Sequence, residues 1–162
     1  MWTPGTKTEL LAEDLKPFNS PYIMEGGQNQ DVFQIDKLTV DGRECHAQCS
    51  FPKYFTSPTD TSFHLSVQRS VDLVTQIALT HALVLNGIDK KEVEIWMPEI
   101  SLRLTKPQRD PDNIKISLFL YGRTVVAPTG QRKSHRTFYR WRIEIGDGDW
   151  FGNVTYCLPI EG

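Results

Sequence analysis

Four polar side chains recur along one stretch of the chain at a spacing that brings proton-handling groups together. His64, Gln68, Asp72 and Thr75 lie in residues 61–87, TSFHLSVQRSVDLVTQIALTHALVLNG, which we predict to be a long helix. On a helical wheel the first, second and fourth of these fall within about 40° of one another, with Asp72 at the edge. An imidazole, a carboxylate and a hydroxyl can accept or orient a reacting proton. A polar stripe of this kind is costly to bury without a function.

The same segment carries an apolar stripe, which predicts the face that packs on the rest of the protein. That stripe consists of Val67, Val71, Val74, Ala78 and Leu85. Arg69, Gln76 and Thr80 are expected to point away from it. Asn86–Gly87 is typical of a helix end.

Strand patterns surround this helix. Residues 31–38 and 43–51 alternate apolar and polar side chains and are joined at Asp41–Gly42, a hairpin turn signal. After the helix, four further strands are predicted at 93–105, 113–126, 134–145 and 151–158. A bend is expected at Pro98–Glu99, where the apolar phase switches.

Two other segments complete the prediction. Residues 8–15 are predicted to form a short N-terminal helix that Pro17 ends, and residues 52–62 are predicted to form a loop. The resulting class is α+β, in one domain over residues 1–162. An antiparallel sheet must bury one face, and the long helix is the element large enough to cover it.

Composition narrows the function classes. The formal net charge is −2, which argues against a nucleic-acid binder. The most basic run, between Arg132 and Arg142, is either a solvated face or a docking patch for an acidic carrier protein or a coenzyme phosphate. The longest nearly apolar run, Ile77–Leu85, is too short to cross a bilayer.

Cysteine and leader patterns suggest where the protein works. Cys45, Cys49 and Cys157 make an odd number, and no second Cys/His pair follows at ligand spacing. The start Met-Trp-Thr-Pro is not a basic-then-apolar leader. We therefore expect reduced thiols in a cytoplasmic protein, with no metal site and no cofactor.

The arrangement resembles the hotdog superfamily of thioesterases and dehydratases, in which a sheet wraps a long central helix. Within it, the sequence is similar to the FcoT-like thioesterase family. The resemblance rests on ELLAEDLKPF at residues 9–18, on CHAQCSFPKYFTSPTDTSFH at residues 45–64, and on the helix that follows. It covers roughly the first 85 residues, and beyond them only the strand layout and a turn at Lys106–Pro107 carry it.

The resemblance implies chemistry on acyl thioesters. Members hydrolyse fatty acyl thioesters, and some in secondary-metabolite biosynthesis first add glycine to an α,β-unsaturated acyl thioester, giving an N-carboxymethyl β-amino acid. In those members a His at the helix entrance and a Thr about three turns later look important, and they match His64 and Thr75 here. Purely hydrolytic long-chain members tend to carry Asn where this chain has Ser66 and Thr75, which favours the glycine-adding branch.

Catalytic roles follow from this reaction. Because an imidazole can be neutral or charged near neutral pH, His64 is either the general base or the cation that holds the glycine carboxylate. Asp72 is the candidate base if His64 binds the carboxylate. Thr75 is expected to orient the amine or a hydrolytic water.

The thioester itself needs binding groups. Backbone N–H groups around Leu65–Val67 suit the oxyanion that forms at its carbonyl. Tyr54 is a candidate to hydrogen-bond the carbonyl or line the acyl pocket, and Leu65, Ser66 and Gln68 are further candidates for binding substrate. The expected substrates are acyl carrier protein or coenzyme A thioesters, together with glycine.

The distance between His64 and Thr75 sets a condition on this site. Eleven residues of ideal helix span about 16 Å, so both side chains of one copy cannot reach the same carbon. The resemblance to hotdog proteins implies a dimer in which the site lies between two antiparallel helices. We therefore expect a homodimer or a dimer of dimers, in which His64 of one copy meets Thr75 of the other.

Other interpretations stay open. A dehydratase of the same fold would use His64 with Asp72, although their eight-residue separation is shorter than expected. A non-catalytic acyl-binding domain would need the pocket but not His64. His64 could also act only as a helix cap, Thr75 could bond back to its own helix, and Asp72 could pair with Gln68.

Overall fold

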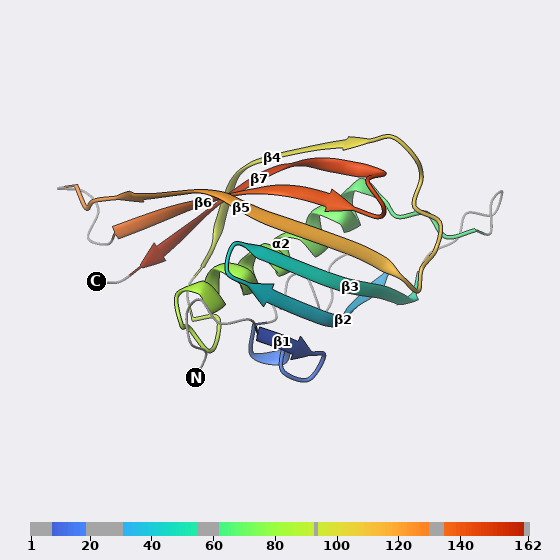
Figure 1. The fold of residues 1–162 in the computed structure, drawn as a ribbon, viewed down its shortest axis with the longest axis horizontal. Coiled ribbons are helices and arrows are strands. Elements are labelled where there is room, and N and C mark those ends of the chain that lie inside the picture. The colour runs from blue at the N-terminus through green and yellow to red at the C-terminus, as the bar shows by residue number, and fades with distance from the viewer. Residues whose placement is uncertain (1–7, 19–30, 55–61, 93, 130–134, 161–162) are drawn as a thin grey trace.

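The computed structural model describes residues 8–18, 31–54, 62–92, 94–129 and 135–160. Seven strands form one antiparallel sheet in the order β1-β2-β3-β5-β6-β7-β4, and a helix, α2, lies against one face of it (Figure 1). The strands are β1 (Thr8–Leu11), β2 (Val32–Asp41), β3 (Glu44–Lys53), β4 (Trp96–Leu104), β5 (Ile114–Val126), β6 (His135–Ile145) and β7 (Trp150–Ile160). The α+β class predicted from the sequence is confirmed, and α2 spans Val67–Leu85.

The strand pair before the helix is confirmed. β2 and β3 pair antiparallel, and Asp41 faces Glu44 across the turn. Gly42 has φ +56°, the positive value that the Asp-Gly signal predicts. Cys45, Ala47 and Cys49 are buried on the face toward α2, and His46 and Gln48 are exposed on the other face. β3 runs on to Lys53, so the predicted loop begins later, and residues 55–61 of that loop lie outside the described residues.

The four strands after the helix are also confirmed, with small changes in their ends. The first of them begins at Trp96, and its pairing with β7 shifts register between Trp96 and Glu99, where the bend was expected. β5, β6 and β7 lie side by side in chain order. β4 then adds to the far side of β7 as one of the two edge strands of the described sheet, the other being β1.

The prediction of an N-terminal helix at residues 8–15 is wrong. Residues 8–11 form β1, which pairs antiparallel with β2, and the single 3-10 turn η1 spans Lys16–Phe18. Leu10 is fully buried while Leu11 is 49% exposed, the alternation of a strand rather than of a helix. The open edge of β2 offers backbone partners that sequence periodicity does not reveal.

The long helix is confirmed but is shorter than residues 61–87. Ser66 caps its start, accepting a hydrogen bond from the Arg69 backbone N–H at 3.2 Å. Ser62 to Ser66 are not helical. Asn86 ends the helix and Gly87 has φ +66°, as the Asn-Gly pair predicts.

The burial of α2 corrects the predicted stripes. Val74 and Ala78 are buried as expected, but Val67 is 50% exposed. Arg69, Gln76 and Thr80, expected to point away from the core, are all buried. The Gln76 Nε2 donates to the carbonyl of Phe18 in η1 at 2.7 Å, so η1 packs against this part of the helix.

Candidate functional site

One strip of α2 remains accessible. From Val67 to Val84, only Val67, Gln68, Val71, Asp72 and Thr75 are exposed or partly exposed, and the remaining side chains are buried. These positions recur every three or four residues and lie in the first half of the helix, so they share one face. The structure thus brings Gln68, Asp72 and Thr75 together, as the polar stripe predicted.

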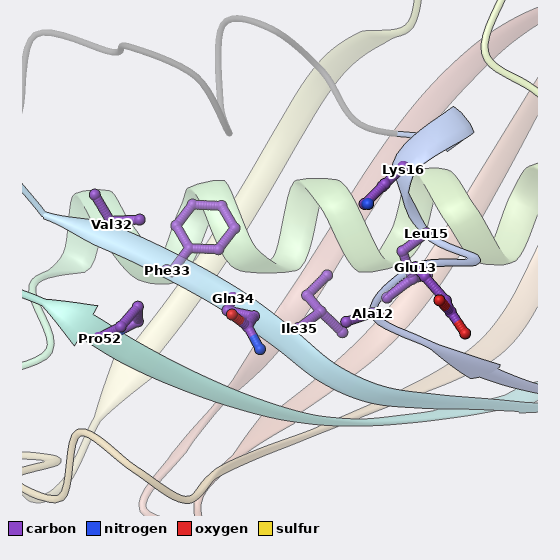
Figure 2. Close-up of a pocket in the computed structure, with 9 residues that line it drawn as sticks. All are labelled: Ala12, Glu13, Leu15, Lys16, Val32, Phe33, Gln34, Ile35 and Pro52. Carbon is purple, nitrogen blue, oxygen red and sulfur yellow. The ribbon is translucent and has the colours of Figure 1, made fainter.

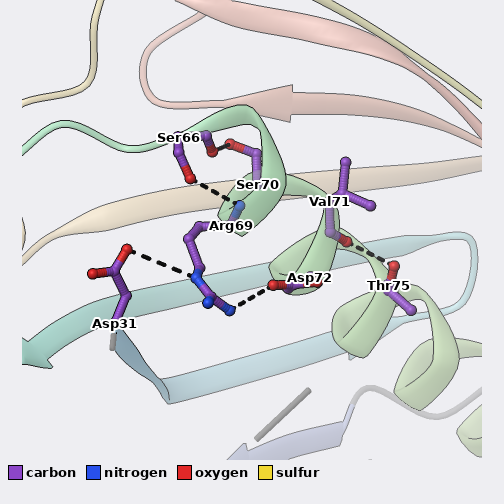
Figure 3. A network of polar contacts seen from close by, with 7 residues as sticks. All are labelled: Asp31, Ser66, Arg69, Ser70, Val71, Asp72 and Thr75. Carbon is purple, nitrogen blue, oxygen red and sulfur yellow. Dashed lines mark hydrogen bonds and ion pairs between the residues drawn. The ribbon is translucent and has the colours of Figure 1, made fainter. Parts of the chain in front are cut away.

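An ion-pair network fixes the carboxylate on this strip (Figure 3). Arg69 Nη1 donates to Asp72 Oδ2 at 2.7 Å, and Arg69 Nε lies 3.7 Å from Asp31 Oδ2. The Arg69 side chain is 5% exposed, and those of Asp72 and Asp31 are 17% and 20% exposed. A carboxylate held by a buried guanidinium has a defined direction and keeps further acceptor positions for a reacting proton.

The environment also changes the acidity of Asp72. Burial raises the pKa of its carboxyl above the ordinary value, and hydrogen bonds from Gln68 and Arg69 act against that rise. A carboxylate with a raised pKa is a stronger base, because it holds an accepted proton more firmly. Gln68 therefore belongs to the surroundings of Asp72.

His64 lies on the segment that leads into the helix, not on the helix itself. Phe63 and Leu65 are buried on either side of it, while His64 is exposed. The Leu65 backbone N–H donates to the carbonyl of Gln108 at 3.0 Å, which further fixes this segment. The helical wheel consequently does not apply to His64, which stands beside the start of α2 as an entrance residue.

The start of α2 has backbone N–H groups that no described residue accepts. The N–H of Leu65 bonds to Gln108, and that of Arg69 bonds to the Ser66 side chain. Among the described residues, no acceptor takes the N–H groups of Val67 and Gln68. Those two N–H groups, at the positive end of the helix dipole, are the ones available for an oxyanion. Ser66 serves as the cap, and the buried Leu65 side chain anchors the segment.

Thr75 makes two hydrogen bonds within the protein. Its hydroxyl donates to the carbonyl of Val71 at 2.6 Å and accepts from the Tyr156 hydroxyl at 2.5 Å. The bond back to its own helix was one of the interpretations left open by the sequence. Tyr156, from β7, was not among the predicted site residues.

Tyr54 lies beside the entrance segment. Its ring packs edge-on against Phe63 with centroids 5.0 Å apart, and Phe63 in turn contacts Phe51 at 5.1 Å. Tyr54 is 36% exposed. Tyr54 therefore packs beside the segment that leads into α2, and its role in lining an acyl pocket stays a prediction.

A cavity of about 380 Å³ lies elsewhere, between the β1–η1 turn and β2 (Figure 2). Its walls include Glu13, Lys16, Phe33 and Gln34. None of its lining residues belongs to the accessible strip of α2. We place the candidate chemistry on the accessible strip of α2, because its side chains include the predicted catalytic groups, and not in this cavity.

A serine, a histidine and a glutamate also meet on the opposite face of the sheet. His46 Nδ1 lies 2.9 Å from Ser117 Oγ, and its Nε2 lies 3.4 Å from Glu44 Oε2. The three residues sit on β3 and β5, and their backbones belong to the paired ladder between those strands. That ladder leaves no free N–H pair to hold an oxyanion, so this trio does not form an acyl-transfer site.

The three cysteine thiols lie in the core. Cys45, Cys49 and Cys157 are buried and free of disulfides, and burial raises the pKa of the Cys45 and Cys49 thiols. In the described ranges, no cluster of three or more His, Cys, Asp or Glu side chains could hold a metal ion. No helix among them is long and apolar enough to span a membrane.

Sequence reasoning missed two members of the site. Arg69 was assigned to a face pointing away from the core, although its i,i+3 spacing to Asp72 is a recognisable ion-pair signal. Tyr156 is 81 residues from Thr75 along the chain, so only the register of β7 could have placed it there.

Comparison with solved structures bears on the fold. A candidate thioesterase from Lactococcus lactis superposes with a TM-score of 0.51 at 12% identity, covering 82% of this chain and 93% of its own. A hypothetical thioesterase from Streptococcus pneumoniae, solved with coenzyme A, gives a TM-score of 0.45 at 12% identity, covering 93% and 98%. A sigma28-regulated virulence protein from Campylobacter jejuni gives 0.40 at 8% identity, covering 93% of each chain.

The first of these likenesses shows the fold. The antiparallel sheet with a helix against it is hotdog-like, as the sequence resemblance implies. No protein-family model matches the chain, and no curated protein matches its sequence. Function therefore rests on the site.

Proposed function

We propose that this protein hydrolyses acyl thioesters carried by acyl carrier protein or coenzyme A. We further propose that it adds glycine to α,β-unsaturated acyl thioesters, giving N-carboxymethyl β-amino acids. The hotdog-like fold, the motifs at residues 9–18 and 45–64, and the pair His64 and Thr75 support this proposal. The accessible strip of α2 supplies a carboxylate, a hydroxyl and helix-start N–H groups on one face.

The observation that carries the proposal is the state of Asp72. It is the carboxylate of the accessible strip, its direction is fixed by Arg69, and its pKa is raised by burial. Asp72 follows Val67 and Gln68 by five and four residues, which corresponds to about 6–8 Å along the helix axis. A thioester carbonyl at the helix start therefore places its neighbouring carbons within reach of Asp72.

Asp72 and the N–H groups of Val67 and Gln68 can account for each proton and electron pair of the addition step. The glycine nitrogen forms a bond to the β-carbon and gives up a proton to Asp72. The electrons of the carbon–carbon double bond move toward the thioester carbonyl, where the Val67 and Gln68 N–H groups stabilise the enolate oxygen. Asp72 then returns its proton to the α-carbon, which restores the thioester and the Asp72 carboxylate and leaves a carbon–nitrogen bond at the β-position.

Hydrolysis uses the same groups. Asp72 takes a proton from water, the oxygen attacks the carbonyl carbon, and the helix-start N–H groups hold the oxyanion. The carbon–sulfur bond breaks, and the leaving thiolate takes up the proton. In this division of roles, His64 at the entrance holds the glycine carboxylate, and it comes from a second copy of the chain.

The test is a product analysis. The protein is incubated with a short 2-enoyl thioester of coenzyme A or of a carrier protein, with and without glycine, and products are followed by mass. The proposal predicts thiol release and a glycine-dependent adduct, both reduced about 100-fold or more in Asp72→Asn, the usual scale for loss of a general base. Interconversion with a 3-hydroxyacyl thioester alone would instead indicate a dehydratase. If no thioester is turned over, both enzymatic proposals are excluded, and a non-catalytic acyl-binding domain is the remaining interpretation.

A further inference from the structure

The hydroxyl of Thr75 has its only proton already committed. A threonine hydroxyl carries one proton and two acceptor lone pairs. The proton goes to the Val71 carbonyl at 2.6 Å, and one lone pair accepts the Tyr156 hydroxyl at 2.5 Å. What remains is one lone pair and no proton. In this arrangement Thr75 can receive a hydrogen bond from a substrate but cannot donate one.

The Tyr156 side chain is held firmly in the position from which its hydroxyl donates to Thr75. It is 2% exposed, and its ring packs against Trp141 with centroids 6.1 Å apart. Trp141 is itself fixed, because it stacks on Tyr139 and its Nε1 donates to His81 at 3.0 Å. Burial raises the pKa of the Tyr156 hydroxyl, which therefore remains a neutral donor. The donor that faces Thr75 cannot easily turn away or ionise.

Thr75 lies on the same helix face as Asp72, and both residues are partly exposed. The two residues are three positions apart, which puts their Cβ atoms about 5–6 Å from each other. A nitrogen between them can donate one N–H to Thr75 and lose another proton to Asp72. An anionic oxygen cannot be bound by Thr75, since Thr75 has no proton to offer it. The carboxylate of an amino acid must then be held elsewhere.

We propose that Tyr156 is a positioning residue that fixes Thr75 as the acceptor for an N–H of the amine co-substrate. This inference rests on the proposed function and deepens it. Thr75 and Asp72 take the amine end of glycine, while the carboxylate end and the enolate oxygen are left to the entrance histidine and the helix-start N–H groups. Tyr156 acts through Thr75 and does not touch the substrate.

The test compares three variants by the Michaelis constant for glycine and the turnover at saturating glycine. Tyr156→Phe removes the hydroxyl and keeps the ring, so we expect the KM for glycine to rise about 2- to 10-fold, the range for one hydrogen bond, with little change in kcat. Thr75→Val keeps the shape but removes the acceptor, so its rise should be at least as large. The double variant should be no worse than Thr75→Val alone, because Tyr156 acts through Thr75.

Other outcomes overturn the inference. Thr75→Ser retains the hydroxyl and serves as the matched control, which should keep most of the wild-type affinity for glycine. An unchanged KM in Tyr156→Phe, or effects that add in the double variant, would show that Tyr156 does not act through Thr75, while the proposed function stands. If the wild type releases thiol but forms no glycine adduct, Thr75 does not bind an amine co-substrate, and the proposed thioester hydrolysis still stands. No thioester turnover at all would remove both.

Discussion

At the scale of single residues, His81 is a titratable side chain whose two ring nitrogens both hold the fold together. Its Nε2 lies 2.9 Å from the Gly42 carbonyl, and its Nδ1 lies 3.0 Å from Trp141 Nε1. A carbonyl only accepts and an indole N–H only donates, so the ring must be neutral, with its proton on Nε2. The ring joins α2 to the β2–β3 turn and to β6, and burial lowers its pKa to about 4.

This shift predicts a loss of stability in acid. The folded pKa of His81, about 4, lies below its ordinary value of 6.5, so the unfolded chain binds the proton first as the pH falls. The free energy of unfolding should therefore decline from about pH 6.5 down to about pH 4, by up to about 3 kcal/mol. Urea unfolding of the wild type and of His81→Gln at several pH values measures the difference. Parallel curves for the two proteins would contradict this assignment.

The residues of the site were only partly predictable from the sequence. Helical periodicity placed Gln68, Asp72 and Thr75 on one face correctly, because side-chain direction on a helix follows spacing. It failed for His64, since Ser66 caps the helix after that residue. It also failed for Tyr156, whose approach to Thr75 depends on the pairing of β7 with its neighbours.

At the scale of elements, β4 and β7 approach closely at one glycine. Gly152 faces Leu102 of β4 on one side and Ile143 of β6 on the other. A Cβ added there would overlap the carbonyl oxygen of Ser101 and lie 2.8 Å from its carbonyl carbon. Because these are backbone atoms, they can make room only if the two strands move apart.

Gly152→Ala should consequently destabilise the edge of the sheet. We expect the free energy of unfolding to fall by about 1–3 kcal/mol, the usual cost of overpacking. Gly122→Ala is the matched control, because its Cβ would lie 3.5 Å from the Arg140 side chain, an ordinary contact. Denaturant midpoints of both variants give the comparison. Equal midpoints would mean that β4 is not held to β7 as described.

The elements themselves were largely predictable, and the exception is instructive. Alternation in the segments from 31 to 51 and from 113 to 158 follows directly from a sheet with one buried face. β1 was mistaken for a helix because Leu10, Leu11 and Leu15 fit a helical spacing as well as a strand followed by a turn. The pairing of Leu10 with Leu38 decided between the two, and that contact is not local in the sequence.

At the scale of the whole molecule, two features favour association of copies. β4 pairs only with β7 among the described strands, and Trp96 and Leu104 at its ends are 58% and 42% exposed. An open edge of this kind readily pairs with another strand. Val67 and the polar strip beside it are likewise uncovered on α2. Both features are consistent with the proposed dimer, in which His64 of one copy meets Thr75 of the other.

The measurement that tests this account most directly is thioester turnover by a mixed dimer. His64→Ala and Thr75→Val subunits, carrying different tags, are co-expressed, and the heterodimer is purified through both tags. At a glycine concentration well below the wild-type KM, each parent homodimer should form the glycine adduct more slowly than the wild type, because one lacks the histidine and the other lacks the amine acceptor. The heterodimer contains one intact site and one doubly altered site, so it should recover about half of the wild-type rate. A heterodimer no faster than its parents, or a His64→Ala protein as active as the wild type, would contradict a site shared between two copies of α2.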